Sequence, residues 1–239
     1  MTVAALITCF NKKDTIISVV EACTQCSDID LIHVYDDSST DGSEELLKSL
    51  SLSRKVKIFF SKVNRGVSYA RNYLFENTDA DIYLLIDGDD VIIPHLKSMQ
   101  IKEFKHNENL LISYSDYYRT FHKKSRHVIA GEFSTKRLEM CNFIPFSSMI
   151  TRKKLFFKNI HYEDYLCWLD NFRGLSLRSV HYFKNPTYYY KSSGTRQSSN
   201  ILRNIISTFS IKRIANVSYK RIFIGTFVYI YNAVQKRII

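Results

Sequence analysis

The feature that most constrains the fold is an alternation of short apolar runs with stretches of helical periodicity in the first 105 residues. The apolar runs are VAALITC, LIHVY, VKIFF and IYLLI. The stretches with helical periodicity cover residues 14–25, 42–50, 67–76 and 94–105. Strands that are apolar throughout are typical of a parallel sheet with helices on both faces. We therefore predict an α/β protein with an open, mostly parallel central sheet.

The pattern becomes mixed after residue 106. We predict a strand over residues 110–121, a basic turn at 122–127, a strand at 147–151 and a helix that begins near Glu163. Two further helices are predicted at residues 200–216 and 219–237. This order divides the chain into an α/β domain of residues 1–198, with halves 1–105 and 106–198, and a helical tail of residues 199–239.

The fourth apolar run ends in DGDD, which places three carboxylates within four residues. Like charges at this spacing repel each other, so the cluster needs solvent, a basic side chain or a hard cation as its partner. Mg²⁺ or Mn²⁺ held by Asp87 and Asp89 fits this chemistry, because these ions combine carboxylates with substrate phosphates. An acidic turn without a ligand is the alternative.

Polar segments follow the other three strands as well, at residues 8–11, 36–42 and 64–72. In open parallel sheets ligands bind beyond the carboxyl ends of the strands, so we expect all four segments to converge on one site. Asp37 can accept a hydrogen bond from a base or a ribose hydroxyl, or belong to a capped turn. Gly66 permits close approach of a ligand, and Arg71 can bind a phosphate or neutralise the aspartates.

The formal net charge of +11 belongs to the C-terminal part of the chain. Twelve Lys and Arg but no Asp or Glu follow Asp170, whereas the first 170 residues hold 22 basic and 23 acidic residues. No nucleic-acid partner is expected, because no DNA- or RNA-binding motif accompanies the charge. Residues 222–235 are 14 uncharged, aromatic-rich residues between basic pairs, which suits a helix lying on an anionic membrane. Alternatively, the tail packs on the domain or on a second copy in a homodimer.

The cysteines and the hydropathy pattern indicate the compartment. Five cysteines with an isolated CxxC, Cys23 and Cys26, do not suggest a disulfide framework. No stretch of 18 uncharged apolar residues occurs, and the N-terminus continues directly into a strand, so we expect neither a spanning helix nor a signal peptide. We predict a cytoplasmic protein, peripherally associated with the cytoplasmic face of the inner membrane.

Five motifs occur in an order and spacing that resemble family 2 glycosyltransferases, which are inverting enzymes of the Rossmann-like GT-A fold. They are TCFN, DDSSTDGS, NRGVSYARN, DGDD and HYEDYLCW, and the resemblance covers roughly residues 1–195. It implies that residues 1–105 bind a nucleotide-sugar donor, with a UDP-hexose or UDP-N-acetylhexosamine expected, and that residues 106–198 bind an acceptor. The donor contacts implied are Thr8, Phe10, Asn11, Asp37, Gly66, Arg71, Asp87, Gly88 and Arg196.

The same resemblance implies the chemistry of the site. Asp89 is the principal ligand of a divalent cation, Mn²⁺ or Mg²⁺, together with Asp87, and Asp164 is the catalytic base. Glu163 and Trp168 contact the acceptor, although Trp168 also suits a core position and the acidic pair also suits a helix N-terminus. Phe10 replaces the tyrosine of many relatives, and no histidine follows His181 to supply a third metal ligand.

The implied function is transfer of a sugar to a hydroxyl of a glycan or lipid-linked glycan in bacterial surface polysaccharide or lipooligosaccharide synthesis. A sugar-phosphate nucleotidyltransferase is one alternative, but TCFNKKD lacks the Gly-rich basic signature expected after its first strand. A non-catalytic nucleotide-sugar-binding membrane scaffold is another. His161 and the loop of Arg196 remain further candidates, the first for catalysis and the second for closing over the pyrophosphate.

Overall fold

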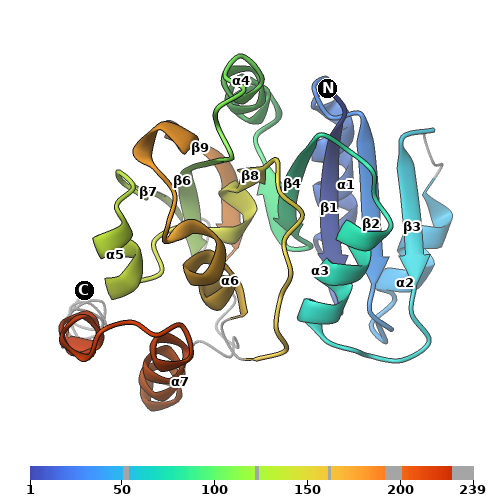
Figure 1. Ribbon diagram of the computed structural model, residues 1–239. Coiled ribbons are helices and arrows are strands. Elements are labelled where there is room, and N and C mark those ends of the chain that lie inside the picture. The colour runs from blue at the N-terminus through green and yellow to red at the C-terminus, as the bar shows by residue number, and fades with distance from the viewer. Residues whose placement is uncertain (51–53, 122–123, 161–162, 192–200, 228–239) are drawn as a thin grey trace.

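The computed structural model describes residues 1–50, 54–121, 124–160, 163–191 and 201–227. These residues form one nine-stranded sheet with the strand order β3-β2-β1-β4-β8-β6-β9-β5, and β7 pairs with β6 (Figure 1). Helices cover both faces of the sheet, so the predicted α/β class is confirmed.

The N-terminal half supplies four parallel strands. Their bounds are β1 Val3–Cys9, β2 Leu31–Asp36, β3 Val56–Phe60 and β4 Ile82–Asp87. The helices that connect or follow them are α1 Ile16–Gln25, α2 Ser43–Ser49, α3 Val67–Glu76 and α4 Pro94–Lys105. Every residue of β1 is buried, as expected of a central strand. The register pairs Thr8 with Asp87, so the ends of β1 and β4 lie side by side.

The second half continues the same sheet with mixed strand directions. Strand β5, Asp90–Ile92, still belongs to the first half. The strands of the second half are β6 Ile112–Phe121, β7 Lys124–Val128, β8 Ile150–Thr151 and β9 Val180–Lys191. Its helices are α5 Thr135–Met140, η1 Phe146–Ser148, α6 Glu163–Phe172 and η2 Leu177–Ser179. The antiparallel strand β8 joins β4 to β6, and β9 runs parallel to β6.

The basic turn predicted at residues 122–127 is corrected by the structure. Residues 124–128 form strand β7, which pairs antiparallel with the end of β6 from Tyr117 to Phe121. Backbone hydrogen bonds of this hairpin override the low strand propensity of the basic residues. The tip, residues 122–123, lies outside the described residues.

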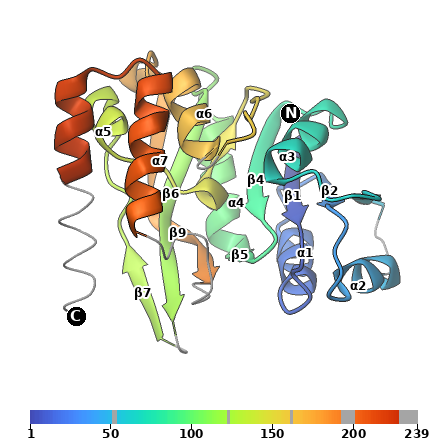
Figure 2. The same ribbon diagram turned by 90° about the horizontal axis from the view of Figure 1, so that it is seen from below.

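The core has two layers, one on each face of the sheet. Helices α3, α5, α6 and α7 lie on one face, and α1 and α2 lie on the other, as the view in Figure 2 shows. Alternate residues of β1 contribute to each layer, with Leu6 on the α3 side and Ile7 on the α1 side. Because the central strands β1 and β4 are covered on both faces, polar groups of these strands are offered at their carboxyl ends.

The described part of the tail packs on the domain. Helix α7, Ile201–Ile214, is followed by helical residues 219–227. Ile211 and Ile222 are buried in the α3-side core, and a Cβ atom built on Gly225 would collide with the backbone of Met140. The inner side of the tail therefore packs on the α/β domain, which is one of the two alternatives to membrane binding given above. None of the helices within the described ranges is long and apolar enough to cross a membrane.

The outer side of the tail is apolar and exposed. Tyr219, Phe223 and Phe227 are 70%, 77% and 68% exposed and recur at intervals of four residues. A spacing of four places them on the same side of a helix. The exposed aromatic side chains thus give the tail an apolar outer surface.

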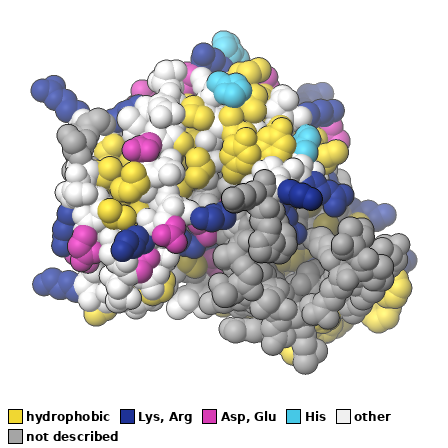
Figure 3. Space-filling view, turned by 180° about the vertical axis from the view of Figure 1, so that it is seen from behind, with side chains coloured by type: hydrophobic (Ala, Val, Ile, Leu, Met, Phe, Trp, Pro, Cys, Tyr) yellow, Lys and Arg dark blue, Asp and Glu magenta, His cyan; other side chains and the backbone are white. Residues whose placement is uncertain are grey.

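On the face opposite that of Figure 1, the Lys and Arg side chains of the described residues lie in several separate places (Figure 3).

Candidate active site

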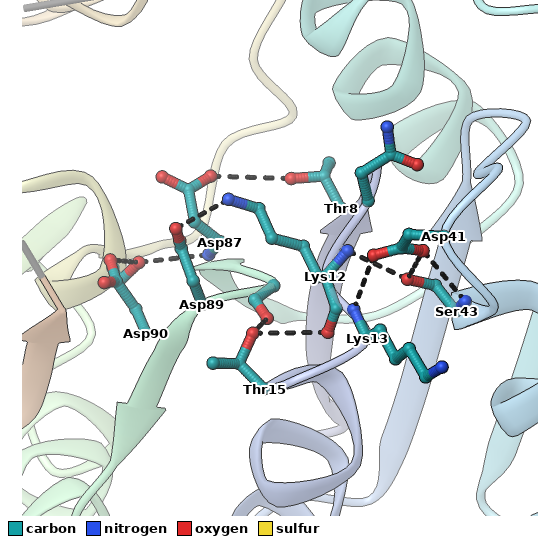
Figure 4. Close-up of polar contacts among 12 residues, drawn as sticks. Thr8, Lys12, Lys13, Thr15, Asp41, Ser43, Asp87, Asp89 and Asp90 are labelled. Carbon is teal, nitrogen blue, oxygen red and sulfur yellow. Dashed lines mark hydrogen bonds and ion pairs between the residues drawn. The ribbon is translucent and has the colours of Figure 1, made fainter. Parts of the chain in front are cut away.

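The DGDD turn is built directly against the end of β1 (Figure 4). The Gly88 N–H donates to the Thr8 carbonyl oxygen at 2.9 Å, and the Thr8 hydroxyl lies 3.4 Å from an oxygen of Asp87. A Cβ atom built on Gly88 would lie 2.6 Å from the Thr8 carbonyl oxygen. Only glycine fits this approach, and the predicted contact of Gly88 with a donor stays a prediction.

The three carboxylates of the turn have different surroundings. Asp90 begins β5, is buried, and accepts a hydrogen bond from the Ser147 hydroxyl at 2.7 Å. The same Ser147 oxygen accepts the backbone N–H of Asp87 at 3.0 Å. Asp87 and Asp89 keep partial exposure, with 33% and 12% of their side chains accessible. Asp90 thus shapes the turn, and the other two carboxylates stay partly accessible.

Asp87 and Asp89 suit a divalent cation that is shared with a substrate. The described residues contain no group of three or more His, Cys, Asp or Glu side chains that would hold a metal ion by themselves. Mg²⁺ and Mn²⁺ are commonly bound by a few carboxylates plus phosphate oxygens and waters, so two carboxylates are a sufficient protein contribution. A positive group already lies at this carboxylate pair, since Lys12 Nζ is 2.6 Å from Asp89 Oδ2.

Arg71 of α3 connects the turn to the start of α6. Its Nη2 donates to Asp87 Oδ1 at 3.0 Å and its Nη1 donates to Glu163 Oε1 at 2.6 Å. The guanidinium is buried and lies 3.6 Å from the centre of the Phe146 ring. The alternative in which Arg71 neutralises the aspartates is therefore realised. Contact of Arg71 with a phosphate stays a prediction.

Glu163 and Asp164 open α6 and differ in their partners. Glu163 is paired with Arg71, whereas Asp164 accepts hydrogen bonds from Asn142 Nδ2 at 3.1 Å and from the Tyr165 N–H at 2.7 Å. Burial raises the pKa of both carboxyl groups, and the charge of Arg71 opposes this rise. Because amide groups stabilise a carboxylate less than a direct arginine contact does, Asp164 is the better candidate of the two for accepting a proton.

The segments after β2 and β3 are held together by Asp37. Its two oxygens accept the backbone N–H groups of Arg65 at 2.9 Å and of Gly66 at 2.7 Å, and its side chain is buried. Gly66 has a φ of 87°, which favours glycine at this loop position. Asp37 therefore fixes the third segment, and its predicted contact with a base or ribose remains a prediction.

The first segment places Phe10 and Asn11 at the rim of the site. The Phe10 ring is exposed. Asn11 adopts a φ of 53°, and its Oδ1 accepts the backbone N–H of Thr40 at 2.8 Å. Asn11 thereby links the segments after β1 and β2. Its direct contact with a donor stays a prediction.

The structure contradicts the predicted acceptor contact of Trp168. Its side chain is 0% exposed, stacks on Phe172 at 5.2 Å between ring centroids, and donates from Nε1 to the Ile144 carbonyl at 3.2 Å. Trp168 lies on the core side of α6, so its large apolar area is buried in the protein instead of against a sugar. His161 and Arg196 lie outside the described residues.

The sequence prediction missed two residues of the site, Lys12 and Ser147. Lys12 contacts Asp89, and the Ser147 hydroxyl bridges the two ends of the DGDD turn. Lys12 is adjacent to Asn11 in a segment already predicted to reach the site, and this position is the one signal that could have found it. Ser147 offers no signal, since it reaches Asp87 from 60 residues away in the sequence.

Two solved GT-A glycosyltransferases share this fold. TarS of Staphylococcus aureus in complex with UDP-GlcNAc superposes with a TM-score of 0.70 at 14% identity, over 90% of this chain and 66% of that chain. Glucosyl-3-phosphoglycerate synthase of Mycobacterium tuberculosis in complex with Mn²⁺ and UDP-glucose gives a TM-score of 0.64 at 17% identity, over 91% and 80% of the two chains. At these identities the likeness establishes the GT-A fold.

The sequence gives the family. The model of Glycosyl transferase family 2 matches residues 4–174. The chain belongs to this family. It is 27% identical over 193 residues to an uncharacterized glycosyltransferase of Haemophilus influenzae. The aligned region covers 77% of this chain and 75% of that protein. It is 31% identical over 113 residues to hyaluronan synthase of Streptococcus pyogenes, but these residues are 43% of this chain and 26% of the synthase.

Proposed function

We propose that the protein is an inverting, metal-dependent glycosyltransferase that moves a hexose or N-acetylhexosamine from a UDP-sugar to a hydroxyl of a glycan or lipid-linked glycan. The pathway we propose is synthesis of a bacterial surface polysaccharide or lipooligosaccharide. Residues 1–105 bind the donor and residues 106–198 bind the acceptor. Solved proteins of this fold that hold UDP-GlcNAc, or Mn²⁺ with UDP-glucose, support the donor class.

One observation carries the proposal. Arg71 pairs at once with Asp87 of the DGDD turn and with Glu163 at the start of α6. This bridge brings a turn that suits a metal and a diphosphate beside a helix start that carries a second carboxylate, Asp164. Displacement at an anomeric carbon needs these two functions, leaving-group stabilisation and proton removal, on opposite sides of the reacting centre.

On the donor side, Asp87 and Asp89 hold the cation. The cation, when bound, stabilises the negative charge that develops on the departing diphosphate. Thr8, Gly88 and Ser147 fix the shape of the turn through the hydrogen bonds described above. Arg71 keeps the Asp87 carboxylate oriented, and its buried positive charge offsets the repulsion between the neighbouring carboxylates.

On the acceptor side, Asp164 removes the proton of the attacking hydroxyl. An acceptor hydroxyl is a poor nucleophile near neutral pH, and a positioned carboxylate contributes about 10² to 10⁴ to the rate. Asn142 and the Tyr165 N–H orient Asp164, while the Arg71 pair holds the adjacent Glu163. Attack from the side opposite the diphosphate inverts the anomeric configuration.

The test is the variant Asp164→Asn. We expect binding of UDP-sugars in the presence of Mn²⁺, measured by calorimetry, to be retained, because the side chain keeps its size and one acceptor oxygen for the Tyr165 N–H. Turnover should fall by about 10² or more, since the base is lost. Undiminished transfer would remove Asp164 from this role, and wild-type protein that binds donors without turnover on any acceptor would favour a scaffold.

We further propose that the tail lies on the cytoplasmic face of an anionic membrane, where lipid-linked acceptors occur. Tyr219, Phe223 and Phe227 supply exposed aromatic rings, and the adjacent Lys220 adds positive charge. Each basic residue near such a surface contributes about 1 kcal/mol of attraction. Replacing Phe223 and Phe227 by Ser should reduce binding to phosphatidylglycerol vesicles while leaving the melting temperature unchanged. Equal vesicle binding by the variant would contradict this proposal.

A further inference from the structure

Lys12 reaches from the segment after β1 across the DGDD turn to Asp89 (Figure 4). Its Nζ lies 2.6 Å from Asp89 Oδ2, and 32% of its side chain is exposed. The aliphatic stem passes directly over Gly88, since a Cβ atom built there would lie 3.3 Å from Lys12 Cγ. Because Gly88 has no side chain, the space that the Lys12 side chain crosses to reach Asp89 stays open.

The backbone of Lys12 is fixed on both sides. Its N–H donates to the Ser43 hydroxyl at 2.8 Å, and its carbonyl accepts the N–H groups of Thr15 and Ile16, each at 2.9 Å. The Thr15 hydroxyl donates to the Gly88 carbonyl at 2.9 Å. The segment and the turn are thus held as one unit. The part of Lys12 that can move is its flexible side chain, which carries a single positive charge.

The neighbouring Lys13 points elsewhere (Figure 4). Its N–H donates to Asp41 Oδ2 at 2.9 Å, and its Nζ and Cδ lie 3.4 Å from a Cβ atom built on Gly42. Two adjacent lysines therefore differ in one respect that matters here, contact with the carboxylate of the turn. Lys13 provides a matched control for any variant of Lys12.

We propose that Lys12 is a resident counter-ion of Asp89 that competes with the divalent cation. Once the cation is bound, the Lys12 side chain swings away from Asp89 and its ammonium group forms an ion pair with the donor's diphosphate. The inference rests on the proposed function, in which Asp89 is the principal metal ligand. An ammonium group at 2.6 Å and a divalent cation on the same carboxylate repel each other strongly. The diphosphate gives the displaced ammonium a new anionic partner beside the metal.

This exchange makes metal and donor binding cooperative. The cation alone has to displace Lys12 without a new partner for the lysine, so its affinity is low. With donor present, the lysine gains an ion pair with phosphate, and by linkage each ligand strengthens the other by the same factor. The protein would then bind metal tightly only together with its substrate.

The experiment measures Mn²⁺ binding by electron paramagnetic resonance, without and with UDP, in wild type and in Lys12→Met. Methionine keeps the aliphatic stem over Gly88 and removes the charge. We expect Lys12→Met to bind Mn²⁺ alone about tenfold more tightly, and UDP at saturating Mn²⁺ about tenfold more weakly, a coupling of ordinary size. Lys13→Met should match wild type in both measurements, and Asp89→Asn should lose Mn²⁺ binding.

The outcomes separate the inference from the function on which it rests. Mn²⁺ binding that is unchanged or weaker in Lys12→Met, with binding still dependent on Asp89, overturns the counter-ion role alone. Equal changes in Lys12→Met and Lys13→Met reduce the effect to general surface charge and overturn it too. If neither wild type nor Lys12→Met binds Mn²⁺ with or without UDP, the metal assignment fails and the inference fails with it.

Discussion

Lys97 of α4 is a buried lysine whose replacement should change how stability depends on pH. Its side chain is 0% exposed, and Nζ donates to Gln100 Oε1 at 3.1 Å and to the carbonyls of Ser147 and Ser148 at 3.3 and 3.4 Å. These partners are all neutral. Burial lowers the pKa of Lys97 from 10.5 to about 7. We predict that Lys97→Met abolishes a rise in stability with pH that the wild type shows.

The sign and the size follow from the two pKa values. Below pH 7 or so the amine is protonated in both states, and the penalty for burying it is complete. Between about 7 and 10.5 the unfolded chain binds a proton that the folded protein does not, so stability rises with pH. The slope approaches 1.36 kcal/mol per pH unit, which gives about 2 kcal/mol between about pH 7 and 9.

The assay is urea unfolding at several pH values across this range, followed by circular dichroism. The free energy of unfolding of wild type minus that of Lys97→Met should increase by about 2 kcal/mol from the lower to the upper pH. Lys102→Met is the control, because Lys102 lies on the same helix with 58% of its side chain exposed. Parallel pH profiles of wild type and Lys97→Met would refute the argument that Lys97 is buried without its charge.

Three further variants or profiles test the site. Gly88→Ala should lower Mn²⁺ and UDP affinity in calorimetry and destabilise the protein by about 1–3 kcal/mol in urea unfolding, because the new methyl group meets the Thr8 carbonyl. Gly174→Ala, with open space around it, should change neither the affinities nor the stability. Trp168→Ala should cost about 3–5 kcal/mol of stability, and Trp168→Phe should leave the acceptor KM unchanged, a result that a stacking role would not allow. Since burial raises the pKa of Asp164, kcat should fall on the acid side with a midpoint above the ordinary value of about 3.9, and a kcat that stays constant down to that pH would exclude Asp164 as the base.

The elements that the sequence predicted well are those whose local pattern and tertiary role agree. Helices α3 and α4 have the predicted bounds, and the four parallel strands fall on the four apolar runs. Strand β9 was missed because VHYFKNPTYYYK mixes basic, aromatic and proline residues, and its pairing with β6 and β5 is what makes it a strand. Pairing partners distant in sequence leave no local signal.

The candidate site shows the same division. Asp87 and Arg71 were predicted to converge because both follow parallel strands, and the structure brings them into direct contact, whereas the pairing of Arg71 with Glu163 was not predicted. The side of α6 that Trp168 occupies, and the choice between Lys12 and Lys13 at Asp89, depend on packing and loop geometry. Residue type alone does not distinguish two adjacent lysines, so a prediction from sequence stops at the segment that carries them.

Strand β8 ties the two halves of the domain, residues 1–105 and 106–198, into one continuous sheet. Ile150 is paired with Leu84 of β4 on one side and with Ser113 of β6 on the other. A hinge beside β8 would have to break one of these two ladders, so the frame favours capture of substrates by loops and side chains at the rim. A rigid frame of this kind would hold the DGDD turn and the start of α6 at a constant separation while substrates bind.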